Sequence, residues 1–234
     1  MPELIFTQPA AAWEEALPVG NGRLGAMVHG GFAAERISLN EDTFWSGPGD
    51  LSLPEVPPGL LGEVRDLVRQ GRSVAAGELL RRTQGADAEA YQPIGDLEIT
   101  FRDSSGGTCR RSLDLRDGVA HVHRDGTRQQ VLASVAYQVI VIRLEADEPG
   151  GIDAELRWRP PHARAEARIV GADGLALLLA APRHVIPWPR RDGAVLDDDD
   201  QRSMRAAALA RVTTDGTVQA TDGGLRIRHG RAAT

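Results

Sequence analysis

The sequence contains no lysine, so all 27 of its basic Lys and Arg residues are arginines, and it contains only two asparagines, Asn21 and Asn40. This bias suggests a GC-rich genome, in which codons for lysine and asparagine become rare. An asparagine that persists against such drift is more often one whose side chain is needed. Both asparagines lie inside the densest polar motifs of the chain, and we therefore treat those motifs as the first candidates for function.

Cysteine is almost absent as well, since Cys109 is the only one. A single thiol excludes an internal disulfide and a cysteine-based zinc site. We interpret Cys109 as a small, semi-buried strand residue, because a reactive thiol needs an exposed and electropositive setting. The sequence offers no cofactor motif in a suitable context, and we predict neither a cofactor nor a metal.

Long apolar runs are also lacking. No run reaches the roughly 18 residues that a membrane span requires, and we predict no contact with a membrane. The first residues have no basic start followed by a long apolar stretch, as a secretory signal would have. We therefore expect a cytoplasmic location.

The charge balance is acidic, with 33 Asp and Glu residues and a net charge of -6. Binding to nucleic acid requires a basic face that neutralises phosphates. The arginines are spread among the acidic residues and form no such face in the sequence. We predict no nucleic-acid partner.

Apolar and polar residues alternate through most of the chain, and turns rich in Asp and Gly separate the alternating segments. Such alternation is typical of antiparallel strands that bury one face. The segment Gln138–Leu144 is apolar on both faces, which predicts a central strand covered by two layers. We predict an all-β fold with strands at 36–39, 97–101, 113–115, 119–123, 138–144, 152–158, 175–180, 204–213 and 224–229.

One stretch, near 58–84, breaks this pattern and predicts a short helical insertion. Its apolar residues are spaced three and four apart, as on one face of a helix. Gly71 is placed to end a first helix, and Ser73 to cap a second. The second helix is then expected to bury Val74 and Leu79 or Leu80.

Residues 20–25 read Gly-Asn-Gly-Arg-Leu-Gly, which fits the G-x-G-x-x-G pattern of dinucleotide-binding proteins. That pattern must close a strand and open a helix, so that the helix N-terminus faces the pyrophosphate. Here the following residues alternate like a strand, and no βαβ unit surrounds them. We interpret the motif as a glycine-rich turn that enters a strand, with Asn21 and Arg23 as its candidate functional side chains.

The second motif, Asn40–Gly47, follows a predicted strand and gathers an amide, two carboxylates, a hydroxyl and an indole. Amides and carboxylates can bind sugar hydroxyls, and an indole can stack on a sugar ring. The same side chains can instead hold the backbone of their own loop, as Asn and Asp often do. The sequence leaves both uses open for Asn40, Glu41, Asp42 and Trp45.

Other polar residues favour no catalytic site. His121 and His123 share one face of a predicted strand but have no identifiable third metal ligand. Glu14 and Glu15 are neighbours in the sequence, whereas glycosidase carboxylates converge from separate positions. No Gly-x-Ser-x-Gly elbow occurs, and we read 197–200, four consecutive aspartates, as an exposed acidic loop.

Three long segments, taken in order, resemble a known family. Trp13–Val28, Leu39–Gly47 and Tyr91–Leu97 are similar to motifs at the start of the family 95 glycoside hydrolases, the inverting α-L-fucosidases. Two short segments depart from that pattern, at Ser134–Tyr137 and Ala206–Ala207. Weaker similarities to the same family lie at 111–115, 138–144, 181–187 and 204–205.

The resemblance implies a large antiparallel β-sandwich, of the supersandwich type that galactose mutarotase also has. Residues 1–234 would form the N-terminal domain of a glycoside hydrolase, shortened at its C-terminal end. In that family a helical barrel carries the catalytic Glu and Asp, and no residue of this sequence matches their positions. We therefore expect no catalytic residue in this chain and no activity of this chain alone.

The same resemblance adds Tyr91 and Gln92 to the candidates for substrate or domain contact. The expected partners are the catalytic barrel and, through the parent protein, a fucosylated oligosaccharide. An unpaired sheet edge would also favour self-association into a homo-oligomer. The alternative that the sequence leaves open is a free-standing carbohydrate-binding module, with tryptophans as stacking platforms.

Overall fold

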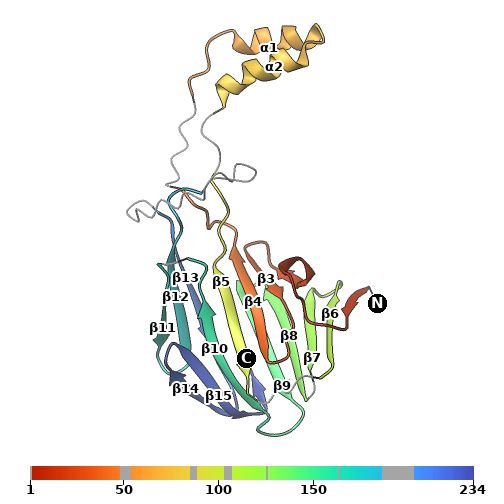
Figure 1. Cartoon of the computed structure of the whole chain (residues 1–234), viewed down its shortest axis with the longest axis vertical. Coiled ribbons are helices and arrows are strands. Elements are labelled where there is room, and N and C mark those ends of the chain that lie inside the picture. Colours follow the sequence, from red (N-terminus) through yellow and green to blue (C-terminus); the bar gives the residue numbers. More distant parts are fainter. Residues whose placement is uncertain are drawn as a thin grey trace.

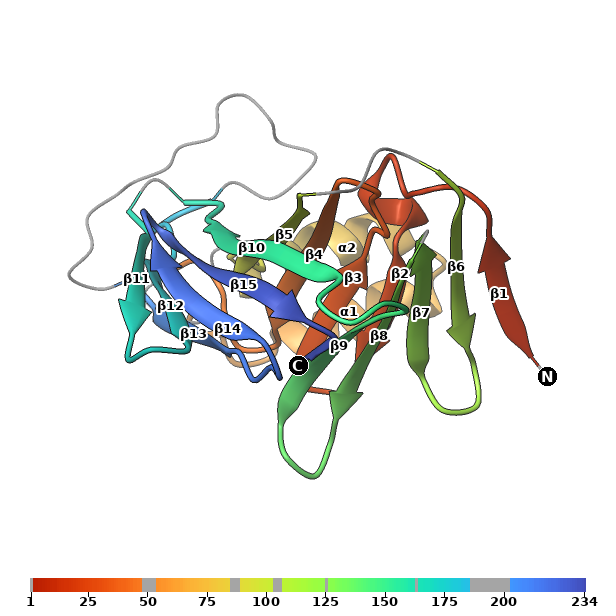
Figure 2. The ribbon, with the colours of Figure 1, turned by 90° about the horizontal axis from the view of Figure 1, so that it is seen from below.

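The protein folds as a two-layer antiparallel β-sandwich, with a pair of helices at one end (Figures 1 and 2). We describe it from a computed structural model that covers residues 2–47, 54–84, 89–102, 107–124, 126–162, 164–185 and 203–234. The all-β fold predicted from the alternating pattern is confirmed, as is the antiparallel sandwich that the family resemblance implies. None of the helices in these ranges is long and apolar enough to cross a membrane.

The first layer is a seven-stranded antiparallel sheet in the order β14-β15-β10-β5-β4-β3-β2. Its inward residues recur at every second position, because side chains alternate between the two faces of a strand. In β5, for example, Leu97 and Ile99 are buried between half-buried and exposed neighbours. The strands are β2 (Leu17–Gly20), β3 (Leu24–Val28), β4 (Ala34–Glu41), β5 (Gly95–Phe101), β10 (Ile152–Arg159), β14 (Thr217–Thr221) and β15 (Gly224–Gly230).

The second layer consists of two sheets. A six-stranded sheet has the order β1-β6-β7-β8-β9-β16, and a three-stranded sheet has the order β11-β12-β13. The first contains β1 (Glu3–Phe6), β6 (Cys109–Asp114), β7 (Val119–Arg124), β8 (Thr127–Ser134), β9 (Val139–Ala146) and β16 (Ala232–Ala233). The second contains β11 (Glu166–Val170), β12 (Gly174–Ala180) and β13 (Arg205–Arg211).

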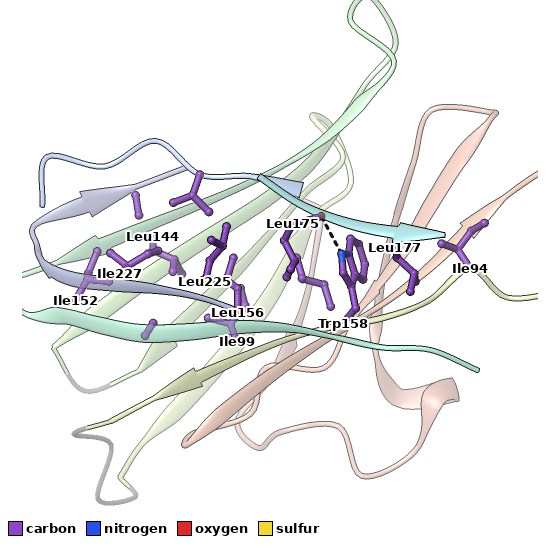
Figure 3. Packing of buried hydrophobic residues seen from close by; sticks show 14 of the residues in the cluster. Ile94, Ile99, Leu144, Ile152, Leu156, Trp158, Leu175, Leu177, Leu225 and Ile227 are labelled. Carbon is purple, nitrogen blue, oxygen red and sulfur yellow. Dashed lines mark hydrogen bonds between the residues drawn. The ribbon is translucent and has the colours of Figure 1, made fainter. Parts of the chain in front are cut away.

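The main hydrophobic core lies between the layers and draws on all three sheets (Figure 3). Leu156 and Ile227 come from the seven-stranded sheet, Leu177 from the three-stranded sheet and Leu144 from β9. Trp158 is buried there, and its indole N–H donates a 2.9 Å hydrogen bond to the carbonyl of Leu175. A second core, including Val28 and Val122, joins β2, β3 and β4 to β6, β7 and β8.

A buried ion pair lies beside this second core. The carboxylate of Glu35, on β4, is fully buried and pairs with the guanidinium of Arg124, on β7. Glu35 also accepts a 2.7 Å hydrogen bond from the backbone N–H of Gly30, and Arg124 donates a 2.9 Å bond to Gln129. Cys109 lies nearby on β6, a strand as expected, but it is buried and not semi-buried, and its thiol donates to the Gly30 carbonyl. Burial raises the pKa of this thiol, which fits a structural residue.

The helical insertion is confirmed. Helix α1 (Leu60–Arg69) ends before Gly71, which has the positive φ of 73° that glycine tolerates best. Helix α2 is Ser73–Leu80, and two short 3-10 helices, η1 (Trp13–Glu15) and η2 (Arg81–Thr83), complete the helical residues. The helices have a small core of their own and lie side by side, away from the sheets (Figure 1).

Two details of the second helix differ from expectation. Ser73 is the first helical residue, and the N-cap is Arg72, which makes no side-chain capping bond. Val74 is 82% exposed, and Ala76 is buried in its place. Ala76 and Leu79 are three residues apart and share one face of the helix, and that face packs against α1, whereas Val74 lies on another face.

The position of β9 also differs from the prediction of a central strand. In the six-stranded sheet it is next to the edge, and only the two-residue β16 lies beyond it. Val139 is accordingly 43% exposed. Its neighbours Ile140, Val141 and Ile142 are only half-buried.

Candidate functional site

Asn21 connects the two layers at one end of the sandwich. Its side-chain oxygen accepts hydrogen bonds from the backbone N–H groups of Arg23, at 3.0 Å, and Leu24, at 2.7 Å. Its amide N–H donates to the carbonyl of Ser134, 2.9 Å away at the end of β8. Asn21 thus holds the turn between β2 and β3 and fixes it to the opposite layer. The interpretation as a glycine-rich turn entering a strand is confirmed, with β3 following directly.

Arg23 makes the next contact across the layers. Its guanidinium donates to the side-chain oxygen of Gln138 at 2.8 Å and to the backbone carbonyl of that residue at 3.3 Å. It also lies 3.5 Å from a carboxylate oxygen of Glu41. Gln138 has a positive φ of 54°, a conformation that its tight turn requires and that few non-glycine residues adopt.

Glu41 serves its own loop as well. Its second carboxylate oxygen accepts hydrogen bonds from the backbone N–H of Thr43, at 2.9 Å, and from the Thr43 hydroxyl, at 2.7 Å. Burial acts to raise the pKa of Glu41, but the Thr43 hydrogen bonds and the Arg23 charge outweigh it and lower the pKa. The carboxylate is therefore ionised at neutral pH.

Trp45 and Tyr91 form an exposed aromatic pair. A single antiparallel bridge joins their backbones, and the ring centroids are 5.4 Å apart with planes inclined by 55°. The indole N–H donates to the carbonyl of Asp42 at 3.0 Å, which fixes the ring. Trp45 remains 41% exposed and Tyr91 42% exposed, so both rings are available to a partner.

Asn40 and Gln92, the remaining candidates, have different roles. Gln92 is buried, and its side chain donates to the carbonyl of Ala90 at 3.0 Å. Its backbone N–H donates to the carbonyl of Phe44 at 2.9 Å, so it holds the loop from within. Asn40 is half-buried beside Gly25, and its side-chain amide makes no hydrogen bond within the described part of the chain.

A cluster that the sequence analysis did not identify lies directly beside this loop. The Ser46 hydroxyl donates to Glu89 at 2.8 Å, and His184 contacts the other carboxylate oxygen through Nδ1 at 2.7 Å. The backbone N–H of Val185 adds a 3.1 Å bond to Glu89. Burial acts to raise the pKa of Glu89, but His184 and the other donors outweigh it and lower the pKa.

This cluster is not a nucleophilic triad. In such a triad the histidine lies between the serine and the carboxylate, so that it can remove the serine proton. Here the carboxylate lies in the middle, and both Ser46 and His184 contact it. Ser46 also accepts a 2.9 Å bond from the N–H of Ala90. The cluster joins three segments of the chain.

Glu41 and Glu89 do not have the raised pKa that is typical of a glycosidase acid. A glycosidase acid needs a pKa raised toward neutrality so that it can donate its proton. The pKa values of Glu41 and Glu89 are lowered instead. Glu35 is the carboxyl group whose pKa is raised by burial, but it is enclosed in the ion pair with Arg124 and cannot reach a substrate.

The other polar residues give no further site. His121 and His123 lie opposite Gln130 and Arg128 on the neighbouring strand, and burial lowers the pKa of His123. Over the described ranges, no group of three His, Cys, Asp or Glu side chains could hold a metal ion. Glu15 accepts a 2.8 Å bond from the N–H of Ala11 at the start of η1. The aspartates at 197–200 lie outside the described residues.

Fold and site together define an all-β sandwich domain with a polar and aromatic surface at one end. The sequence matches the family "Glycosyl hydrolase family 65, N-terminal domain" over residues 4–234, and the chain belongs to this family. The resemblance to the N-terminal domain of a glycoside hydrolase is thereby confirmed. The narrower assignment to family 95 stays a prediction.

Three curated relatives carry α-fucosidase names. Alpha-L-fucosidase 2 of Arabidopsis thaliana is 35% identical over 165 residues, which are 67% of this chain and 20% of that protein. Probable alpha-fucosidase A of Aspergillus oryzae is 29% identical over 127 residues, 49% of this chain and 17% of that protein. Probable alpha-fucosidase A of Aspergillus niger is 32% identical over 117 residues, 46% of this chain and 14% of that protein. The matched stretches thus cover a fifth or less of each relative.

Proposed function

We propose that this domain is a non-catalytic support of an α-L-fucoside hydrolase and packs against a separate catalytic domain of the same polypeptide. The loop Asn40–Gly47, together with Tyr91, would face that domain and lie at the edge of its active site. Hydrolysis would follow the inverting scheme, in which an acid and a base on the catalytic domain lie far enough apart to admit a water molecule. The names of the three relatives support the substrate class.

The exposed Trp45–Tyr91 pair is the observation that carries this proposal. Aromatic residues are enriched in the buried centres of protein interfaces, and these two rings are held in place by the Asp42 hydrogen bond and the backbone bridge. The neighbouring carboxylates of Glu41 and Glu89 accept hydrogen bonds from Thr43 and Ser46, which belong to the same loop. A surface built in this way has little conformational entropy to lose on docking.

An activity assay tests the proposal. The isolated chain is incubated with an aryl α-L-fucoside, and release of the aryl alcohol is measured against a blank. We expect no turnover above background, because no carboxyl group at the site is poised to donate a proton. Turnover that Glu41→Gln abolishes would overturn the proposal. Glu98→Gln, on an exposed part of β5, is the matched control.

A free-standing carbohydrate-binding module is the second candidate, and the exposure of the Trp45 ring favours it. Aromatic rings stack on sugars in such modules. The 55° inclination between Trp45 and Tyr91 argues against a flat two-ring platform, although one ring could still stack alone. Titration with fucose and fucosylated oligosaccharides, followed by tryptophan fluorescence, separates the candidates. Saturable binding that Trp45→Ala abolishes would favour the module.

A further inference from the structure

An apolar groove of about 850 Å³ separates the two sheets of the second layer. One wall is β9 and the other is β13, while Leu156 and Trp158 of the seven-stranded sheet line its floor. Figure 2 shows β9 and β13 on either side of the C-terminal residues. The second layer therefore has a gap between β9 and β13, whereas the first layer is one continuous sheet.

Among the described residues, both walls present strand edges that β16 pairs only in part. β13 pairs with β12 on one side and ends the three-stranded sheet on the other. β9 pairs with β8 along its whole length, but with β16 only at Leu144 and Glu145. Leu209 on β13 is 57% exposed. Free edges beside apolar side chains favour the addition of another strand.

β16 already begins to close the groove, because it contacts both walls. Ala233 is opposite Leu144 on β9 and forms an antiparallel bridge with Thr214 just beyond β13. Thr234 exchanges two 2.8 Å backbone hydrogen bonds with Thr213. Neighbouring strands lie about 4.8 Å apart, so at this point the two walls are separated by the width of one strand.

We propose that the groove binds one further antiparallel strand, and that this strand is the direct continuation of β16. Because β16 is antiparallel to both walls, each residue added after Thr234 would pair with the preceding residue of β9 and of β13. The first residue after Thr234 would therefore lie between Ile142 and Val212, and the third between Ile140 and Ala210.

The two registers agree on which way each side chain would point. Ile140 and Ile142 of β9 pack against the cores, as do Ala208 and Ala210 of β13. Directly paired residues share one face of a sheet, so the first, third and fifth added residues would all point inward. The second and fourth would point outward, beside Arg211 and Leu209. This agreement extends the pairing that β16 already makes with both walls at Ala233.

The filled groove would join the second layer into one nine-stranded sheet, with β9 fifth from either edge. β9 would then be paired on both edges, which is the lateral position of a central strand. The added strand would run toward Gln138 and Arg23, which lie at the end of the groove that also holds Glu41 and Thr43. The inference rests on the proposed function in one respect, namely that more polypeptide follows, and it places the exit of that polypeptide beside the candidate site.

Two extended forms of the chain test this inference. One carries Val-Thr-Val-Thr-Val-Thr after Thr234, which directs valine inward, and the other carries Thr-Val-Thr-Val-Thr-Val, which directs it outward. Their compositions are identical, and a shift of one residue reverses the face of every side chain. The unextended chain is the reference. Thermal unfolding and hydrogen exchange of peptides from β9 and β13 are measured.

We expect the first extension to raise the midpoint of unfolding by roughly 5 °C and to slow exchange at both strand edges about tenfold. The second extension should do neither. Equal effects of the two extensions would overturn the inference, as would a dimer of the unextended chain in which both edges are already protected. No sugar and no second domain enter this experiment, so its failure would be distinct from failure of the proposed function.

Discussion

The side-chain amide of Asn21 donates a hydrogen bond to the backbone carbonyl of Ser134, 113 residues further along the chain and 2.9 Å away. This bond crosses from the seven-stranded sheet to the end of β8 in the opposite layer. The side-chain oxygen of Asn21 meanwhile accepts two backbone bonds from its own turn.

Asn21→Ala should destabilise the domain by about 2 kcal/mol, because it removes three hydrogen bonds that are part-buried or exposed and a typical hydrogen bond contributes about 0.5–1.5 kcal/mol. Chemical denaturation measures this directly. Asn40→Ala is the matched control, since the Asn40 amide makes no hydrogen bond within the described residues, and its effect should stay below about 0.5 kcal/mol. Equal losses for the two variants would contradict the structural role of Asn21.

Glu35→Gln should cost about 3–5 kcal/mol of unfolding free energy, because it leaves the buried Arg124 guanidinium without its counter-charge. The comparison is Glu98→Gln, which breaks the exposed pair with Arg159 and should cost less than about 1 kcal/mol. Urea denaturation at neutral pH separates the two. A small effect at Glu35 would show that the buried pair contributes little to the stability of the second core.

The Glu89 cluster predicts a pH dependence of stability. Because the folded-state pKa of Glu89 is lowered, its stabilisation is present above the unfolded value, about 4.3, and is lost as the pH falls through the folded value. Glu89→Gln should therefore be less stable than the parent sequence at pH 7. The difference should shrink as the pH falls below about 4.3 and should disappear once the pH is below the folded-state pKa of Glu89. Glu148→Gln, at an exposed side chain, is the control.

Gly47→Ala should disturb the same cluster by a different route. Gly47 has a φ of 94°, and a β-carbon there would overlap the side chain of Glu89. We expect a loss of about 1–3 kcal/mol from the strained backbone alone and weaker protection of the loop in hydrogen exchange. Gly71→Ala is the control, because its φ is also positive but no atom lies near its would-be β-carbon.

The sequence predicts those elements whose own residues carry the signal. Leu97 and Ile99 alternate cleanly, and β5 follows from them. Short strands at the edges, such as β1 and β14, were missed because half-exposed strands bury too few residues to show a period. β2 was missed because Pro18 interrupts its pattern.

Contacts between distant segments could not be predicted from the pattern in the same way. Glu89 and His184 are 95 residues apart, and only the packing of the strands brings them together. Trp45 and Tyr91 lie on opposite sides of the helical insertion in the sequence. Both residues were candidates, but the sequence did not predict that they contact each other. The residues of the motifs lie together at one end of the sandwich. The motifs did not show that Asn21 and Gln92 are structural while the aromatic rings remain exposed.

The most direct test of the account is to measure binding between this chain and the separately produced remainder of its parent polypeptide. Sedimentation velocity should detect a complex that Trp45→Ala and Tyr91→Ala each weaken at least tenfold, and mixing should restore hydrolysis of an aryl α-L-fucoside. Val170→Ala is the control, because this exposed residue lies beside the β11–β12 turn, away from the aromatic pair. A complex that tolerates both aromatic substitutions, or fucoside turnover by this chain alone, would contradict the account.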